Sequence, residues 1–529
     1  MQAQLIEYII LIIIILLLVM LSQRLKIAYP IVLVVGGLLV SLFNVIPGVH
    51  IDPEFTLLIF LPPLLYEAAW NTSWKELWRW RRVISSFAFL VVIMTSTVVA
   101  YISDNAIPGF TLALGFLLGG IVSPPDAVSA TSILKYVKVP RRVSSIIEGE
   151  SLLNDASSLI VFKFAMAAVV TGRFVFHEAA LNFVWVIAMG IATGIGVALV
   201  FFGLHRWLPT NANMDTILTL TAPYAMYIAA ESLHFSGVLA VVSGGLFLAA
   251  RSHRFLTYQS RMQAINFWST IGFVLNGLVF MLIGLELPVI IRALGQVSFA
   301  SAVGYGCLIT GVLILTRMLS TLGASWFTVF MSRFIKTEDS RPGWRGPVVF
   351  GWAGMRGVVS LAAALSIPVY LPDHSPFPQR NLILFITFTV ILLTLVVQGL
   401  TLPLLIRWVN LPDPDHYLSP EEQLKEIKKG LAETSVAFLQ DHHADLLKGN
   451  ESVQQLLSRF EHLQRVDDGD ELREREQYRK VNLQLLAHQH EYLHKVNEEP
   501  GSDESVIRSY HNLLDIEEEK LRHRFGTEE

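Results

Sequence analysis

The chain has 529 residues, of which 53% are hydrophobic and 16% are charged. A soluble domain typically carries about 25% charged residues, so this composition excludes an ordinary water-soluble protein and indicates an all-α polytopic membrane protein. The net charge of −4 gives no reason to expect nucleic-acid binding. The single cysteine, Cys307, excludes a disulfide framework and a thiolate metal cluster, and no motif requires a cofactor.

Apolar stretches long enough to cross a bilayer recur along the chain, with short polar loops between them. The first, from Leu5 to Leu21, has no basic residue ahead of it, which favours a membrane span over a cleaved signal peptide. We predict about thirteen transmembrane helices. They are expected near residues 5–22, 28–43, 54–70, 83–103, 110–137, 147–170, 181–204, 216–231, 237–250, 267–291, 298–330, 347–367 and 381–406.

The basic residues indicate the orientation, because cytoplasmic loops of membrane proteins collect Lys and Arg. Alternate loops hold Arg24, Lys26, Lys75, Arg79, Arg81, Arg82, Lys135, Lys138, Arg141, Arg142, Arg206, Arg251, Arg254, Arg261, Arg333, Lys336, Arg341 and Arg345. The intervening loops hold Arg173, Arg292 and Arg380. This alternation predicts a multi-pass protein of the cell (inner) membrane, with its N-terminus outside and everything after Trp408 in the cytoplasm.

The composition changes abruptly after Pro412, where the chain becomes charged and apolar residues recur at helical spacing. We therefore divide the chain into a transmembrane domain, residues 1–410, and a cytoplasmic helical C-terminal domain, residues 411–529. Two to four amphipathic helices are expected in the second domain, the first with Ser419 as cap and Pro420 at its first position. The histidines of this domain are interpreted as solvated surface residues rather than as a pH sensor. They are His442, His443, His462, His488, His490 and His494.

Helix-breaking residues interrupt two of the predicted spans. One contains the run GGIVSPPD from Gly119 to Asp126, and the other contains GWAGMRG from Gly351 to Gly357. These are the fifth and twelfth spans. If the spans form two six-helix sets separated by one linking span, each interrupted span is the fifth member of its set. An odd number of spans then separates the starting points of the two sets, so the second set is inverted relative to the first. Paired interruptions in inverted repeats indicate the midplane binding site of a secondary transporter.

Four polar residues, Glu150, Ser151, Asn154 and Asp155, stand at the head of the sixth span. At helical spacing Glu150 lies one turn before Asn154. Ser151 lies one turn before Asp155 on the adjoining stripe of the helix. Such groups are costly in hydrocarbon and indicate a functional site, although the same residue types also cap helices that follow a loop.

Asp126 follows two prolines that cannot donate backbone hydrogen bonds, so the carbonyls just ahead of it are available to a cation. The sixth span begins about twenty residues later, so Asp126 and Asp155 can converge across neighbouring helices. Monovalent cations and protons both bind oxygen, and a cation competes with the proton for an ionised carboxylate. Competition at one shared site produces obligate exchange of a cation for a proton.

Further charges lie within the predicted spans. The charge of Arg356 in the second broken span has to be neutralised, and Glu150 is the expected partner in a structural ion pair. Glu67 in the third span either faces an aqueous cavity or reaches for the lipid headgroups. Lys163 and Arg317 are interpreted as snorkelling or packing charges.

Four ordered motifs stand in the predicted membrane region. They are LPPLLYE from Leu61 to Glu67, SPPDAV from Ser123 to Val128, GESLLND from Gly149 to Asp155 and GWAGMRG from Gly351 to Gly357. Together they resemble the signatures of sodium/proton antiporters of the NhaP and NHE type, in the monovalent cation:proton antiporter superfamily. The resemblance covers the predicted membrane region, whereas the tail carries no motif that we can place.

The resemblance implies a homodimer in the lipid bilayer, with a dimerisation domain and a mobile core domain in each subunit and elevator-like alternating access. By motif position it makes Asp155 the principal ion- and proton-binding carboxylate and Asn154 its structural neighbour. The remaining residues that it implies are Ser151 and Asp126 as ligands of Na⁺ or K⁺, Glu67 acting through water, and Glu150 paired with Arg356.

The pair of Asn154 and Asp155 resembles that of electroneutral members, whereas electrogenic relatives have two aspartates there. Pro125 is a departure, because many relatives carry Thr at this position. Proline offers a cation its carbonyl but neither a hydroxyl nor an N–H group.

We therefore predict an electroneutral Na⁺/H⁺ antiporter, not an enzyme, that exchanges one monovalent cation for one proton. A K⁺/H⁺ antiporter with the same site, or a preference for Li⁺, stays open because selectivity depends on cavity geometry. The alternative from another class is a cation channel or a membrane sensor acting through the tail. A channel favours a selectivity loop repeated around an oligomer axis, which the sequence lacks, and a sensor predicts that Asp155 is dispensable.

Overall fold

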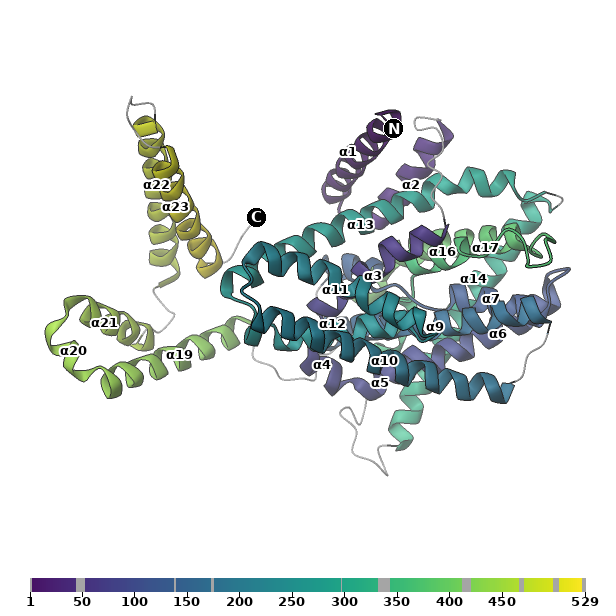
Figure 1. Ribbon diagram of the computed structural model, residues 1–529, viewed down its shortest axis with the longest axis horizontal. Helices are drawn as coiled ribbons and strands as arrows, with labels where there is room; N and C mark the ends of the chain where they lie inside the picture. The colour runs from purple at the N-terminus through teal and green to yellow at the C-terminus, as the bar shows by residue number, and fades with distance from the viewer. Residues whose placement is uncertain are drawn as a thin grey trace. The chain divides into compact units, whose positions relative to one another are not determined.

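The computed structural model is built of helices and divides into two compact units, Met1–Asp413 and Pro414–Glu529 (Figure 1). It describes residues 2–43, 53–137, 139–172, 176–295, 297–331, 343–411, 420–465, 471–497 and 504–525. Within these ranges no strand forms, and the isolated bridge between Tyr370 and Pro376 is the single β-type pairing. The predicted all-α class is confirmed.

A helix, or a helix with a break, lies at every predicted span. The first unit contains α1 (Gln2–Leu25), α2 (Tyr29–Leu42), α3 (Pro53–Asn71), α4 (Trp74–Arg79), α5 (Arg81–Ser85), η1 (Ser86–Val91), α6 (Val92–Ala106), α7 (Leu112–Val122), α8 (Ala127–Leu134), α9 (Arg141–Thr171), α10 (Phe176–Trp207), α11 (Ala212–Ser232), α12 (Gly237–Phe255), α13 (Tyr258–Arg292), α14 (Phe299–Met331), α15 (Arg345–Trp352), α16 (Val358–Leu365), α17 (Arg380–Leu393), η2 (Thr394–Gln398) and α18 (Gly399–Val409). The segments η1 and η2 are π-helical.

Several of these segments are long and apolar enough to cross a membrane. In the described part of the chain they number seven: Arg81–Ala106, Leu112–Leu134, Arg141–Thr171, Asn182–Trp207, Tyr258–Arg292, Phe299–Phe330 and Arg380–Val409. Two shorter apolar helices, Ile9–Leu25 and Tyr29–Leu42, lie ahead of them. The chain is therefore a polytopic membrane protein, whereas the total of about thirteen spans and the inverted repeat stay predictions.

Both predicted helix interruptions are present. α7 ends at Val122 and α8 begins at Ala127, because the two intervening prolines lack the N–H groups that continue a helix. α15 ends at Trp352 and α16 begins at Val358, where glycines replace residues of higher helix propensity. Each interrupted span therefore consists of two half-helices whose inner ends carry unpaired backbone groups.

The helices of the first unit pack in two groups. α1, α2, α3 and α10 to α13 pack mainly against one another and are called the scaffold helices below. α4 to α9 and α14 to α18, with η1 and η2, also pack mainly against one another and are called the core helices. The groups meet through smaller contacts, such as those of α9 with α12 and of α3 with α16. Inside each group small residues bring backbones together: a Cβ on Gly119 of α7 would collide with the backbone of Ser96 on α6.

The second unit contains α19 (Pro420–His442), α20 (Ala444–Gly449), α21 (Glu451–Arg465), α22 (Glu471–Asn497) and α23 (Glu504–Phe525). The short α20 makes one helix more than the two to four predicted. α19 packs against α21, and α22 packs against α23.

A histidine pair joins α22 to α23. His490 Nδ1 lies 2.7 Å from His511 Nδ1, and His490 Nε2 lies 3.6 Å from Asp515 Oδ1. His490 is half-buried in this contact, so the interpretation as a solvated surface residue is wrong for it. The side chain of His462 lies outside the described residues.

Candidate ion-binding site

The two helix breaks meet at Asp126. Its backbone N–H donates a 2.7 Å hydrogen bond to the carbonyl of Met355 in the other break. Its side chain caps α8: Oδ1 accepts from the Val128 N–H at 3.1 Å, and Oδ2 accepts from Ser129 N–H at 3.2 Å and Oγ at 2.5 Å. A carboxylate at this position satisfies unpaired N–H groups and interacts favourably with the helix dipole. Asp126 thereby joins the two breaks.

Gly357 lets the second broken helix approach this carboxylate. It is the residue before α16, and a Cβ built on it would collide with the side chain of Asp126. The Asp126 carboxylate therefore lies beside the first residues of both α8 and α16. The positive ends of two half-helices converge on one negative charge.

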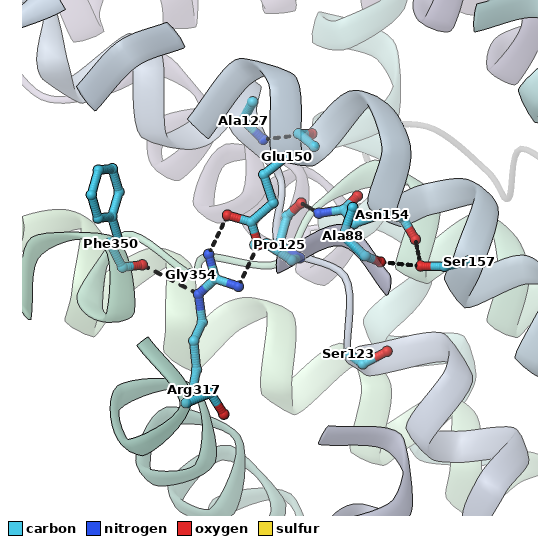
Figure 2. Close-up of polar contacts among 12 residues, drawn as sticks. Ala88, Ser123, Pro125, Ala127, Glu150, Asn154, Ser157, Arg317, Phe350 and Gly354 are labelled. Atoms are coloured by element: carbon cyan, nitrogen blue, oxygen red, sulfur yellow. Dashed lines mark hydrogen bonds and ion pairs between the residues drawn. The ribbon is translucent and has the colours of Figure 1, made fainter. Parts of the chain in front are cut away.

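α9 holds the first break from the opposite side. Asn154 is fully buried, and its Nδ2 donates to the carbonyl of Pro125 at 3.0 Å (Figure 2). Its Oδ1 is buried and lacks a hydrogen-bond partner among the residues that the structure describes. One turn earlier, the Oγ of Ser151 accepts a 3.1 Å hydrogen bond from the N–H of Ala127. The α9 stretch singled out from the sequence therefore packs directly on the break at Asp126.

Asp155 is the least satisfied carboxylate of this cluster. Asp155 belongs to α9, and 8% of the residue is exposed. The described part of the chain supplies no hydrogen bond to its oxygens, and Ser151, one turn earlier on α9, bonds to the residue that follows Asp126. A buried carboxylate without donors is destabilised unless a proton or a cation binds to it.

The structure corrects the predicted ion pair of Glu150 with Arg356. Arg317 on α14 holds Glu150 instead, with Nη1 and Nη2 at 2.7 and 2.9 Å from its two carboxylate oxygens (Figure 2). Both residues are buried, so of the two interpretations Arg317 is a packing charge and not a snorkelling one. Arg356 also lies within electrostatic range of Glu150, but Arg317 is the arginine that binds its carboxylate.

Arg356 has a different task. It is fully buried, and its Nε and Nη2 donate to the carbonyls of Val122 and Ser123 at 2.8 and 3.3 Å. Its Nη1 also donates to the carbonyl of Gly354. A guanidinium at the carboxyl end of α7 satisfies the unpaired carbonyls and opposes the negative end of the helix dipole. Arg356 thus stabilises the break itself.

The two π-helical segments also touch the site, and the sequence offered no signal for them. Ser157 Oγ lies within hydrogen-bonding distance of the carbonyl of Ala88 in η1. In η2, Thr394 Oγ1 accepts a 3.2 Å hydrogen bond from the backbone N–H of Arg356. Single-turn π-helices often occur at functional sites, because they shift a helix relative to its neighbours.

Glu67 lies on the scaffold side, on α3. It is half-buried, and its Oε1 accepts a 2.8 Å hydrogen bond from Asn71 Nδ2. Asn71 is the last residue of α3, at the end that is predicted to lie in the cytoplasm. No hydrogen bond between described residues links Glu67 to Asp126 or Asp155.

Comparison with known proteins agrees with this arrangement. A family model described as "Sodium/hydrogen exchanger, transmembrane" matches residues 10–408. A sodium, potassium, lithium and rubidium/H⁺ antiporter of Bacillus pumilus is 37% identical over 391 residues, which are 72% of this chain and 58% of that relative. The chain thus spans less than two thirds of that relative's length.

An uncharacterized Na⁺/H⁺ exchanger of Mycobacterium bovis is 32% identical over 514 residues, which are 95% of this chain and 93% of that relative. The solved structure of the sodium proton antiporter MjNhaP1 from Methanocaldococcus jannaschii superposes with a TM-score of 0.61 at 16% identity, over 77% of this chain and 99% of that one. At this identity the likeness concerns the fold. The match of the family model over most of the first unit decides the assignment. The chain belongs to the family of transmembrane sodium/hydrogen exchangers.

Proposed function

We propose that this protein is an electroneutral Na⁺/H⁺ antiporter that exchanges one monovalent cation for one proton. One observation carries the proposal: Asp155 is a buried carboxylate to which the described residues donate no hydrogen bond. Nearly all buried polar groups in proteins find partners, so a carboxylate without donors is suited to bind an exchangeable ion. A proton and a cation then compete for the same oxygens.

The proposed cation ligands are Asp155, Asp126 and Ser151. Asp126 already accepts hydrogen bonds from Val128 and Ser129, so Asp155 is the carboxyl that alternates between proton and cation. Asn154 is proposed as a structural neighbour. Glu67 is proposed to contribute through water, since no hydrogen bond between described residues links it to the two aspartates.

Charge balance supports a one-for-one exchange. Glu150 is neutralised by Arg317, and Asn154 carries no charge, so neither group gains or loses a charge during the cycle. One carboxylate that binds either one cation or one proton keeps the same charge in both loaded states. Transport then moves no net charge across the membrane.

The two groups of helices support alternating access of the elevator type. The Asp126 and Asp155 site lies on the core helices, which pack less extensively on the scaffold helices than within their own group. We propose that the core helices slide along the scaffold as a body, in a homodimer. Met1–Asp413 is then the transmembrane domain and Pro414–Glu529 the cytoplasmic domain, in the cell (inner) membrane with the N-terminus outside.

K⁺/H⁺ exchange at the same site is the second candidate. The name of the Bacillus pumilus relative includes potassium, lithium and rubidium beside sodium. Oxygen ligands bind all of these cations. Cation-dependent activity with Na⁺, K⁺ and Li⁺ over a pH series would determine the preference.

Purified protein in proteoliposomes with an enclosed pH dye tests the proposal. We expect a Na⁺ gradient to drive proton movement in the wild type, and Asp155→Asn to abolish it. Asp104→Asn is the matched control, since Asp104 is exposed at the end of α6 and should leave transport unchanged. Cation-driven proton movement that persists in Asp155→Asn would overturn the mechanism.

Voltage distinguishes the remaining alternatives. An electroneutral antiporter keeps its rate when a membrane potential is imposed without a K⁺ gradient, whereas an electrogenic exchanger or a channel responds strongly to it. A sensor acting through the tail predicts normal output in Asp155→Asn and loss of output when residues 414–529 are removed.

A further inference from the structure

Lys163 on α9 and Glu231 on α11 form an ion pair between the core and scaffold helices. We propose that this ion pair is an outer gate, which must break each time the core moves; the proposal rests on the antiport by alternating access proposed above. Neither residue belongs to the motifs of the ion-binding site.

The geometry ties one core helix to two scaffold helices. Lys163 Nζ lies 2.8 and 2.7 Å from the two carboxylate oxygens of Glu231. Glu231 Oε1 also accepts a 3.2 Å hydrogen bond from the N–H of Gly237, the first residue of α12. Glu231 therefore joins α11 to α12 and offers Lys163 a fixed partner.

The position of the pair along α9 makes it an outer gate. Lys163 follows Asp155 by about 12 Å along the helix axis, towards the end predicted to lie outside. The intervening residues are buried up to Ile160. In the other direction Ser151 and Asp126 are half-buried and Glu148 is exposed. On the Lys163 side of Asp155 the α9 residues are therefore buried for about one and a half turns, whereas residues towards the cytoplasmic end of the site are partly exposed.

The exposure of the pair suits a contact that breaks in every cycle. The side chain of Lys163 is 53% exposed and that of Glu231 is 31% exposed. A partly exposed ion pair shifts an equilibrium by only about 1.5- to 5-fold, so it biases the resting state without trapping it. The buried pair of Glu150 and Arg317 is different, because both of its residues lie on core helices and stay together when the core moves.

Reversible cross-linking in the full-length protein tests the gate. Cys307 is the single cysteine, so Cys307→Ser provides a cysteine-free parent. Lys163→Cys and Glu231→Cys are introduced together and bridged with a bifunctional methanethiosulfonate, and bridging is verified by mass spectrometry. In proteoliposomes we expect transport before bridging, loss of transport after bridging, and recovery on reduction.

A second cysteine pair serves as the matched control. Asn213 on α11 and Gln263 on α13 are joined by a 2.7 Å side-chain hydrogen bond, and both lie on scaffold helices. Bridging Asn213→Cys to Gln263→Cys should leave transport unchanged, because these helices keep their relative positions. Continued transport by the bridged 163/231 variant, or equal loss in both variants, would overturn the gate. Absence of Na⁺-driven proton movement in the wild-type protein would instead count against the proposed antiport.

Charge removal provides an independent readout. Lys163→Met removes the ion pair that holds the outer gate closed, so the outward-open state gains population. The apparent KM for Na⁺ should therefore shift by about 1.5- to 5-fold, in opposite directions on the two membrane faces. Lys163→Arg keeps the charge and should keep the wild-type values. Equal KM shifts on both faces, or none, would contradict the gate.

Discussion

The corrected partner of Glu150 leads to a prediction that separates two arginines. Arg317 forms both short contacts to the Glu150 carboxylate, at 2.7 and 2.9 Å, whereas Arg356 bonds to backbone carbonyls. Glu150→Gln removes the negative charge and leaves the buried guanidinium groups of Arg317 and Arg356 within electrostatic range of each other. Arg317→Leu removes the partner and leaves the carboxylate buried. Both single variants should be strongly destabilised.

The magnitude follows from the burial of the pair. Glu150 is 1% and Arg317 is 3% exposed, so neither charge can be rehydrated without opening the helix packing. Removing one partner of a buried pair costs about 3–5 kcal/mol, while replacing both partners by uncharged groups of similar volume is often neutral. Arg317→Leu also leaves the carbonyl of Phe350 without its 3.3 Å donor, which adds about 1 kcal/mol. The double variant Glu150→Gln/Arg317→Leu should therefore be more stable than either single variant.

Thermal unfolding in detergent, followed by tryptophan fluorescence, measures this order of stabilities. The second double variant, Glu150→Gln/Arg356→Leu, is the comparison, because Arg356→Leu leaves the carbonyls of Val122 and Ser123 without donors. We expect it to be less stable than Glu150→Gln alone. If it were instead rescued, and Glu150→Gln/Arg317→Leu were not, the pairing of Glu150 with Arg317 would be refuted.

Three further predictions concern single positions. Gly357→Ala places a Cβ against the Asp126 carboxylate and should abolish transport in proteoliposomes. Gly311→Ala on α14 is the control, because its Cβ meets open space and transport should be retained. An active Gly357→Ala variant would mean that the Asp126 carboxylate does not lie beside Gly357. Asn154→Ala removes the 3.0 Å hydrogen bond to the carbonyl of Pro125 and should lower the free energy of unfolding by about 1–3 kcal/mol, measured by thermal unfolding. Asn105→Ala loses an exposed hydrogen bond to Tyr101 and should lower it little. Equal losses of stability in the two variants would contradict this expectation. His490→Ala breaks the contact to His511 and should speed amide hydrogen exchange in α22 and α23. His488 is exposed, so His488→Ala should leave the exchange rates unchanged. Unchanged exchange in His490→Ala would show that the histidine pair does not stabilise the α22–α23 hairpin.

Much of the fold is local information. Apolar runs, two prolines and closely spaced glycines are enough to locate helices and their breaks, because span length and helix propensity depend on neighbouring residues. The π-helical segments η1 and η2 escaped prediction, since no residue type marks where a helix takes in an extra residue. In the tail, His490 and His511 are 21 positions apart, so their contact requires the α22 and α23 hairpin to form first.

The sequence by itself determined which chemical groups are available. These are the carboxylate of Asp126 at the proline break, the carboxylate of Asp155 on a membrane helix with the amide of Asn154 beside it, and the guanidinium groups of Arg317 and Arg356. Tertiary structure decided how these groups are paired. Glu150 is 167 positions from Arg317 and Arg356 is 234 from Val122, and nothing local distinguishes the two arginines as partners. The physical reason is that a buried charge must be satisfied by whatever the packing brings within about 3 Å, and packing is a property of the whole helix bundle.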